Sequence, residues 1–337
     1  MQTYIVLIAC VILLLCLFFR VPVYISVFAA ALTYFLFQTG SSPAIIAQRI
    51  GGGIQSIPLL AIPFFICAGI FMNSSGVTKR IMNFCNVVTK RMTGGLGQVN
   101  VLLSTLMGGL SGSNLADAAM EAKILVPEME EKGYSKEFSS VLTATSAMIT
   151  PLIPPGIGMI LYGSIANVSI GKLFVAGIGI GVLLCISLMI MVHFISKKRG
   201  YQPATKEKQD PEEVKSAVKQ AILPLCLPIL IIGGIRIGIV TPTEAGTVAI
   251  VYALILGIIY KELKMSDVVD GLKESVATTA SIMMIVGGAS AFAWVLTKER
   301  IPQQLTEVIT SNISNKYVFL IIVILFLLVV GMFIEGN

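Results

Sequence analysis

The sequence predicts an all-α polytopic membrane protein with re-entrant helical hairpins and discontinuous helices. Of its 337 residues, 55% are hydrophobic and only 12% are charged. A soluble domain has about a quarter charged residues. Several apolar runs approach the length of a bilayer span, and two others are interrupted by glycine or proline. Together these observations indicate a chain whose helices are solvated by lipid.

Six apolar runs are long enough to cross a membrane, which takes about 20 helical residues. They are residues 3–19, 21–38, 173–196, 237–260, 275–297 and 317–334. Glu244 is the charged residue among them. The first run lacks a basic leader and a small-residue cleavage site, so we expect a retained span rather than a signal peptide.

The basic residues predict the orientation. The chain carries a formal charge of +6, mostly in short loops, which favours topological signalling over nucleic-acid binding. The most basic loop, 197–219, is placed in the cytoplasm as a linker. Alternating the spans then puts 18 of the 24 lysines and arginines inside and 6 outside, with the N-terminus periplasmic. We expect a multi-pass protein that is embedded in the lipid of the bacterial inner membrane.

The six cysteines and the single histidine favour no metal or redox chemistry. No cysteine pair has C-x-x-C spacing, and His193 lies in an apolar run. An intramembrane enzyme would need paired aspartates, a serine–histidine arrangement or a metal-ligand cluster. We therefore expect no cofactor and no enzymatic activity, and an intramembrane enzyme is the weaker alternative.

The first interruption lies in residues 108–114, with the sequence GGLSGSN. Two glycines and a Ser-Gly-Ser-Asn run disfavour helix, so a re-entrant hairpin is predicted over about 99–130. Its tip offers carbonyls, hydroxyls and a carboxamide that suit a cation, whereas glycine-mediated helix packing is the alternative. The candidate cation and substrate residues are Ser111, Gly112, Ser113, Asn114 and Asp117, with sodium placed at Ser111, Ser113 and Asn114. For Asp117, capping the second helix is favoured over ligation.

The second interruption predicts a broken helix over about 139–166. Three prolines and a glycine fall in residues 151–156, PLIPPG, and cannot sit in an unbroken span. Hydroxyl-bearing residues come just before this break. They are Thr143, Thr145, Ser146 and Thr150, and Pro154, Pro155 and Gly156 lie in the break itself.

Similar residues recur at a nearly constant offset, which predicts two inverted repeats. The pairs Pro22 with Pro242, Gly69 with Gly288, and Gly109 with Gly331 are 220, 219 and 222 residues apart. The first repeat spans 1–196, with an amphipathic arm over about 77–98, and the second spans 220–337. A counterpart of the arm is expected at 261–273. The second repeat stops at its hairpin, so we expect a C-terminally truncated sequence.

The second repeat carries its own candidate residues. Glu244 follows Thr241 and Pro242 as in a capping box, and capping and binding are equally favoured there. Gly287, Gly288 and Ser290 break or thin a helix and are candidates for a second cation site, although close helix packing explains them equally well. Thr243 lies beside Glu244, and Glu335, Gly336 and Asn337 lie where the second hairpin would turn.

Four ordered motifs resemble the large membrane subunit of tripartite ATP-independent periplasmic (TRAP) transporters. They are LLAIPFF at 59–65, GLSGSNLADAA at 109–119, PLIPPG at 151–156 and TPTEA at 241–245. The resemblance implies an inverted-repeat, elevator-type transporter that couples uptake of an organic anion to sodium. It also implies that residues 111–114 and the break at 143–156 hold one sodium ion and flank the substrate, and that residues 287–290 and 335–337 serve the second half. It also implies a small integral-membrane (Q-type) subunit and a periplasmic substrate-binding protein as partners. A stand-alone elevator transporter without a binding protein is the alternative.

Overall fold

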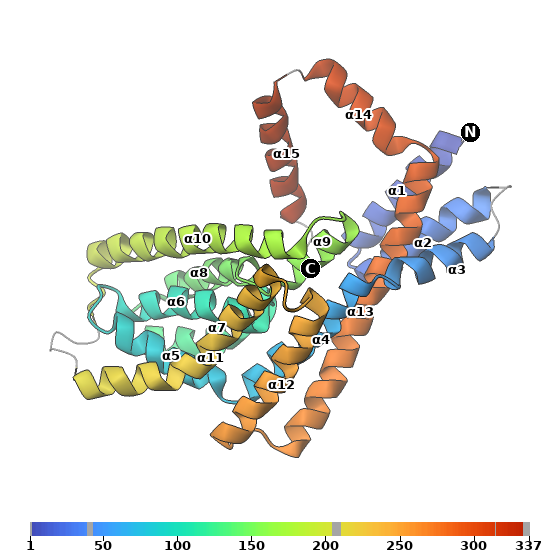
Figure 1. Ribbon diagram of the computed structural model, residues 1–337. Coiled ribbons are helices and arrows are strands. Elements are labelled where there is room, and N and C mark those ends of the chain that lie inside the picture. The colour runs from blue at the N-terminus through green and yellow to red at the C-terminus, as the bar shows by residue number, and fades with distance from the viewer. Residues whose placement is uncertain (1, 39–42, 204–209, 314, 333–337) are drawn as a thin grey trace. The chain divides into compact units, whose positions relative to one another are not determined.

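The computed structural model describes residues 2–38, 43–203, 210–313 and 315–332, and every regular element in these ranges is a helix (Figure 1). The chain separates by internal contacts into a central unit, Ile57–Ala277, and a terminal unit, Met1–Ser56 with Thr278–Asn337. These two units are defined by contacts within the structure. The two predicted repeats, 1–196 and 220–337, are defined by residues that recur along the sequence, so the two divisions differ.

The central unit contains most of the described helices. They are η1 (Ile57–Leu60), α4 (Ala61–Ser74), α5 (Val77–Thr89), α6 (Gly95–Ser111), α7 (Asn114–Glu131), α8 (Lys136–Ser146), η2 (Ala147–Leu152), α9 (Ile157–Ile165), α10 (Ile170–Arg199), α11 (Pro211–Ile237), α12 (Pro242–Tyr260) and the start of α13 (Met265–Lys298). The terminal unit contains α1 (Gln2–Phe18), α2 (Val23–Phe37), α3 (Pro43–Ile54), the rest of α13, α14 (Ile301–Asn312) and α15 (Lys316–Gly331).

The helices confirm a polytopic membrane protein. Among the described residues, five helices are long and apolar enough to cross a membrane: Ile57–Ser74, α10, α11, α12 and α13. A sixth candidate is the bent pair Lys136–Leu152 and Ile157–Ile165. In α10 the most apolar window has a mean hydropathy of 2.7, yet only 22% of it is buried within the protein. Such exposed apolar surface is satisfied by lipid and would be costly in water.

Two predicted boundaries shift because capping residues set the helix ends. The linker predicted at 197–219 shortens, since α10 continues to Arg199 and α11 begins at Pro211. Asp210 caps α11 by accepting a hydrogen bond from the Glu212 amide. The arm predicted at 77–98 is also shorter, because α5 ends at Thr89 and α6 begins after the left-handed Gly94. At 261–273, the structure has a turn followed by the start of α13 rather than a separate arm.

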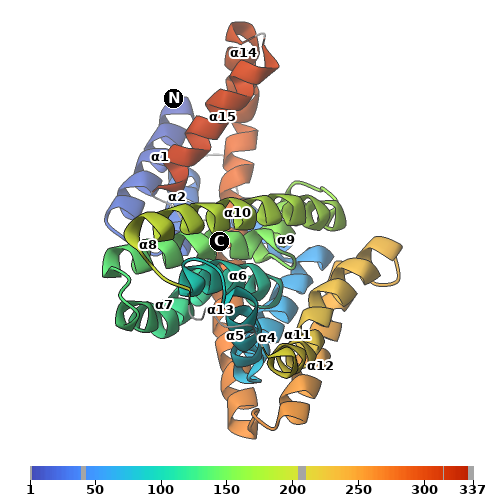
Figure 2. The same cartoon turned by 90° about the vertical axis from the view of Figure 1, so that its left-hand side faces the viewer.

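The core of the central unit forms where α6, α7, α8 and η2 pack with α10, which Figure 2 shows from a second side. Buried residues there include Val101, Met129, Leu142, Ile149 and Val192. In the terminal unit a smaller cluster joins Val6, Tyr34 and Val295. The larger core holds the α6–α7 hairpin firmly against the segment that contains the predicted helix break.

Candidate functional site

The predicted hairpin is present, but its break is smaller than expected. Helix α6 continues through Gly108 and Gly109 to Ser111, and α7 begins at Asn114. Gly112 takes φ +63° at the C-cap of α6, and Ser113 caps α7 by accepting from the Ala116 amide at 3.4 Å. The prediction that 108–111 leave the helix is wrong, because glycine weakens a helix without breaking it. The side chain of Ser111 lies outside the described part of the chain.

The predicted broken helix is confirmed. Helix α8 ends at Ser146, the 3₁₀ turn η2 covers Ala147–Leu152, and α9 begins at Ile157. The two arms bend by 45°, and the Pro154–Pro155 peptide is cis. The prolines have no amide hydrogen to continue the ladder, which explains the break.

The hairpin tip and the broken helix pack directly on each other. A β-carbon placed on Gly112 would lie 2.7 Å from the carbonyl oxygen of Pro155. On Gly108 it would lie 2.7 Å from the carbonyl oxygen of Thr150. On Gly109 it would lie 3.3 Å from the carbonyl oxygen of Pro154. The packing interpretation of Gly108 and Gly109 is therefore confirmed, and the structure brings the two predicted breaks together.

Buried hydrogen bonds link α6 to α8 below the tip. The Asn100 amide donates to the Thr143 hydroxyl at 2.7 Å, and the Ser146 hydroxyl donates to the Asn100 carbonyl oxygen at 2.6 Å. All three side chains are buried. Thr145, by contrast, donates to Val141 of its own helix at 2.7 Å. The structure thus joins Thr143 and Ser146 in one network but not Thr145.

A second set of buried hydrogen bonds reaches α7. The Ser104 hydroxyl donates to Glu121 at 2.7 Å, and the Thr150 hydroxyl contacts Asp117 at 3.0 Å. Both carboxyl groups are fully buried. The Asp117 side chain accepts a hydrogen bond from Thr150 of η2, because α7 packs against that turn, and its predicted capping role stays a prediction.

The sequence interpretation missed Asn100, Ser104 and Glu121. A signal was available, since Asn100 and Ser104 are four residues apart in an apolar helix, as are Asp117 and Glu121 in α7. Residues at this spacing share one helix face. A polar stripe on an apolar helix, or a carboxyl group within a membrane hairpin, marks a functional candidate.

The candidates at the start of α12 form a cap. The Thr241 amide donates to the Glu244 carboxylate at 2.7 Å, and the Glu244 amide donates to the Thr241 hydroxyl at 3.3 Å, which completes a capping box. Thr243 donates to the Ile57 carbonyl at 3.3 Å. Of the two equally favoured interpretations of Glu244, the described contacts match capping.

The second-repeat candidates in α13 lie in an unbroken helix. The expectation that Gly287 and Gly288 thin or break it is wrong, since α13 runs from Met265 to Lys298. A β-carbon on Gly287 would lie 3.1 Å from Ile50, and Ser290 packs against Gly53 of α3. Close helix packing therefore explains these small residues. Glu335, Gly336 and Asn337 lie outside the described residues.

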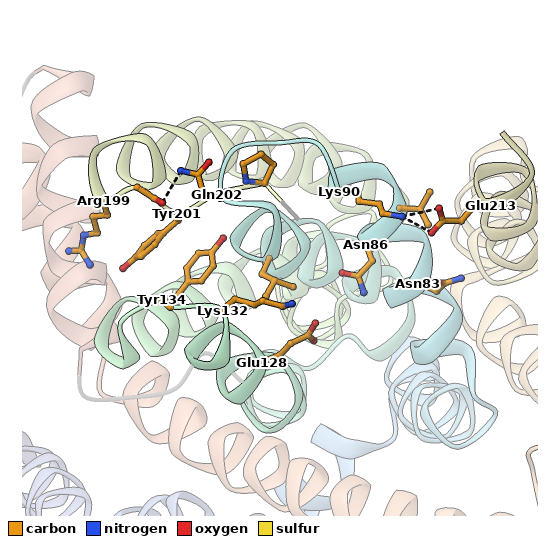
Figure 3. Close-up of a pocket in the computed structure, with 15 residues that line it drawn as sticks. Asn83, Asn86, Lys90, Glu128, Lys132, Tyr134, Arg199, Tyr201, Gln202 and Glu213 are labelled. Carbon is orange, nitrogen blue, oxygen red and sulfur yellow. Dashed lines mark hydrogen bonds and ion pairs between the residues drawn. The ribbon is translucent and has the colours of Figure 1, made fainter. Parts of the chain in front are cut away.

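A polar cavity of about 560 Å³ lies where α5, α7, α10 and α11 end (Figure 3). Lys90 and Glu213 form an ion pair at 2.9 Å on its wall, and the rings of Tyr134 and Tyr201 stack with centroids 4.2 Å apart. Burial acts to raise the pKa of the Tyr201 phenol, but hydrogen bonds to Ser135 and the nearby guanidinium of Arg199 outweigh it and lower that pKa. The cavity joins helix ends and contains none of the predicted site residues.

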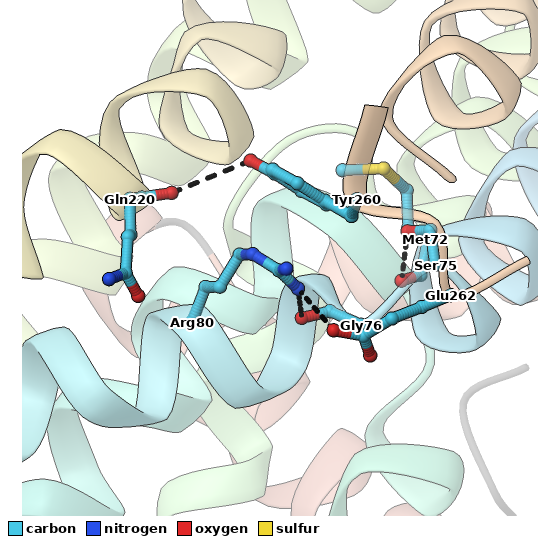
Figure 4. A network of polar contacts seen from close by, with 7 residues as sticks. All are labelled: Met72, Ser75, Gly76, Arg80, Gln220, Tyr260 and Glu262. Atoms are coloured by element: carbon cyan, nitrogen blue, oxygen red, sulfur yellow. Dashed lines mark hydrogen bonds and ion pairs between the residues drawn. The ribbon is translucent and has the colours of Figure 1, made fainter. Parts of the chain in front are cut away.

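The basic residues of α5 are anchored to later elements of the central unit. Arg80 donates to the Gly76 carbonyl at 2.8 Å and to Glu262 at 2.9 Å, and its guanidinium lies 3.6 Å from the ring centroid of Tyr260 (Figure 4). The Tyr260 hydroxyl contacts the Gln220 carbonyl at 3.5 Å. These contacts hold α5 to the α11–α12 region.

Comparison with known proteins places the chain in a family. Residues 10–337 match the family model described as the tripartite ATP-independent periplasmic transporter, DctM component. The chain is 41% identical over 321 residues to the sialic acid TRAP transporter large permease protein SiaM of Vibrio cholerae, covering 95% of this chain and 75% of that protein. It is 38% identical over 330 residues to the sialic acid TRAP transporter permease protein SiaT of Haemophilus influenzae, covering 98% of this chain and 53% of that one. The C4-dicarboxylate TRAP transporter large permease protein DctM of Pseudomonas aeruginosa is 34% identical over 310 residues, with 92% and 72% covered.

The chain thus spans about half the length of SiaT and about three quarters of SiaM. Its fold and site define a polytopic membrane protein organised around a helical hairpin that packs on a broken helix. It belongs to the DctM-component family of TRAP transporters, the large permeases.

Proposed function

We propose that this protein is the translocating subunit of a binding-protein-dependent secondary transporter that imports a small organic anion with sodium. The observation that carries the proposal is the packing of the Gly112 turn on the Pro155 carbonyl. Two interrupted helices meet there, and unwound backbone at membrane depth belongs beside a cavity rather than lipid. Helix ends at such a place suit both a carboxylate and a cation.

The proposed substrate is a carboxylate-bearing organic acid. The relatives are named for sialic acid and for C4-dicarboxylates, and both kinds of compound carry carboxylates. No lysine or arginine falls in residues 99–122, so the tip itself supplies no fixed positive charge for the substrate. A sodium ion held by Ser111, Ser113 and Asn114 would supply it and would couple the two binding events.

The proposed transport cycle is an elevator-like motion of inverted repeats. Its support is the order of the helices. Helices α2, α5 and α6 begin at residues 23, 77 and 95, and α12, α14 and α15 begin at 242, 301 and 316. The offsets of 219, 224 and 221 residues extend the repeat seen in the sequence. Opposite orientation of the two halves would place a site between them near the membrane midplane.

The proposed partners are a small Q-type membrane subunit and a periplasmic binding protein that delivers the anion. The relatives are named as permeases of TRAP systems, which supports this assembly. We place the protein in the bacterial inner membrane, with the N-terminus in the periplasm and the basic α10–α11 connection in the cytoplasm. An impermeant thiol reagent should then fail to label a cysteine placed at Gln202 in intact cells.

The test is uptake of labelled sialic acid or a C4-dicarboxylate into proteoliposomes that contain the full-length permease, its small subunit and loaded binding protein. Replacing Ser113 or Asn114 by alanine removes a side-chain oxygen from the tip, so the sodium concentration for half-maximal uptake should rise by about fivefold or more. Ser187→Ala, which removes an exposed hydroxyl in α10, is the matched control.

Three outcomes would contradict parts of this proposal. If both tip variants kept the wild-type sodium dependence, the side chains of Ser113 and Asn114 would not form the cation site. If uptake did not depend on a sodium gradient, sodium would not be the coupling ion. Rapid uptake by the permease alone, without the small subunit and the binding protein, would favour a stand-alone elevator transporter.

A further inference from the structure

Glu121 is a fully buried carboxyl group inside the α6–α7 hairpin, and the proposed sodium site at the tip does not use it. One carboxyl oxygen, Oε2, accepts a hydrogen bond from the Ser104 hydroxyl at 2.7 Å. The other oxygen, Oε1, is also buried and has no hydrogen-bond partner among the described residues. An ionised carboxylate needs donors on both oxygens when it leaves water, so this environment is incomplete for a negative charge.

Among the described residues, the groups found beside Glu121 supply no positive charge. Its own helix contributes the carboxyl group of Asp117, and α5 contributes the thiol of Cys85. The polar side chains that α6, α8 and η2 bring to this network are neutral: Asn100, Ser104, Thr143, Ser146 and Thr150. Within α7 the basic residue is Lys123, which is exposed.

The cationic side chains of the described residues either form ion pairs away from Glu121 or are exposed. The ion pairs found there join Arg80 with Glu262, Lys90 with Glu213, and Lys273 with Asp270. None of them reaches the hairpin interior. Two negative charges on adjacent turns of α7 would therefore be buried together without a counter-charge, which a low-dielectric interior strongly disfavours.

The two carboxyl groups are not equivalent. Asp117 lies in the first turn of α7, where the helix dipole stabilises a negative charge, and it also contacts the Thr150 hydroxyl. Glu121 lies one turn further on, where this effect of the helix end has largely faded. Protonating Glu121 therefore costs less free energy than protonating Asp117.

We propose that Glu121 is a proton-binding site of the folded permease: it holds a proton on Oε1 while Oε2, as the carbonyl oxygen, accepts from Ser104. The hairpin interior then carries one negative charge rather than two. This site is separate from the sodium site proposed at the tip, and it does not depend on the transport function. Because an exposed glutamate is ionised at neutral pH, unfolding releases the proton, and the folded state loses stability as the pH rises.

The experiment is infrared spectroscopy of the purified full-length permease in lipid nanodiscs at neutral pH. Wild-type protein should show the C=O stretching band of a protonated carboxylic acid, and Glu121→Gln should abolish it. Glu130→Gln, which changes an exposed carboxyl group on the same helix, should leave the band intact. A spectrum in which Glu121→Gln removes only carboxylate bands would show that Glu121 is ionised, held by a bound cation, and would overturn the proposal.

A second variant keeps the proposal testable if Glu121→Gln does not fold. Ser104→Ala keeps the carboxyl group and removes its donor, so the carboxylic-acid band should shift to higher frequency. If there is no such band to shift, the proposal fails. The melting temperature of wild-type protein should also fall more steeply between pH 6 and pH 8 than that of Glu121→Gln. The difference between the two pH slopes corresponds to at most one proton released per molecule on unfolding. Equal slopes would overturn the proposal.

Discussion

The chain breaks at residues 153–156 but runs as one helix through residues 287–290, although both stretches are apolar and contain small residues. The difference is proline. Pro151, Pro154 and Pro155 interrupt the first stretch, whereas α13 contains no proline. A proline in a helix interior costs about 3 kcal/mol, and a glycine costs only about 1 kcal/mol. At these two places glycine marks close helix packing, and the run of prolines marks a break. Isolated prolines elsewhere do not break a helix, since α7 continues through Pro127 and α11 through Pro224 and Pro228.

The two regions also differ in what their small residues touch. Gly108 approaches the backbone of Thr150, which cannot move without shifting the break. A β-carbon on Gly287 would approach a side-chain methyl group of Ile50 rather than a backbone atom, and at the longer distance of 3.1 Å. The same residue type is thus rigidly required in the hairpin and more replaceable in α13.

The largest effect should come from adding a methyl group to the hairpin contact. In Gly108→Ala the new β-carbon would lie 2.7 Å from the Thr150 carbonyl oxygen, so α6 and η2 must separate. We expect a loss of about 1–3 kcal/mol of stability, as for other overpacked sites, and a clear drop in uptake. Thermal unfolding in detergent and uptake in proteoliposomes measure both.

Gly287→Ala is the matched control for this comparison. Its β-carbon would lie 3.1 Å from a methyl group of Ile50, and alanine favours helix. The melting temperature should stay within about 2 °C of wild type. If Gly287→Ala were as damaging as Gly108→Ala, the distinction between backbone and side-chain neighbours would be wrong.

A smaller effect should follow from the polar network of the hairpin. Asn100→Ala leaves the hydroxyls of Thr143 and Ser146 without their shared partner. We expect a loss of about 1–3 kcal/mol, because these groups are buried. Ser290→Ala in α13 changes a half-buried residue that packs on Gly53, and it should cost less than about 0.5 kcal/mol. Equal costs in denaturant titrations would mean that the hairpin network contributes no more than ordinary packing.

The smallest effect should come from the exposed cap of α12. Glutamine can accept the same hydrogen bond as Glu244 in a capping box, so Glu244→Gln should leave stability and uptake close to wild type. Thr241→Ala removes the capping hydroxyl and should lower the melting temperature slightly. A large loss of uptake in Glu244→Gln with normal stability would show that the carboxylate binds a ligand, and the capping interpretation would then be incomplete.

The sequence by itself determined those features that depend on neighbouring residues along the chain. Of the six apolar runs, 173–196, 237–260 and 275–297 match the spans α10, α12 and α13, and the prolines at 151–156 located the broken helix. The spans Ile57–Ser74 and α11 were not among the six runs, and the runs 3–19, 21–38 and 317–334 form shorter apolar helices. Thr241 with Glu244 as a capping box follows from chemistry within one turn. These predictions succeeded because dihedral preference, capping and hydropathy are local properties.

Only the tertiary structure decided what lies across from each helix. It showed that Gly108 and Gly109 pack against the broken helix rather than unwinding, and that Asp117 accepts a hydrogen bond from Thr150 of η2. It also revealed Glu121 beside Ser104, a pairing between residues 17 positions apart on two different helices. A helix sequence shows which residues share a face, but the partner of that face is fixed by packing between helices, since burial and hydrogen bonding depend on distant segments.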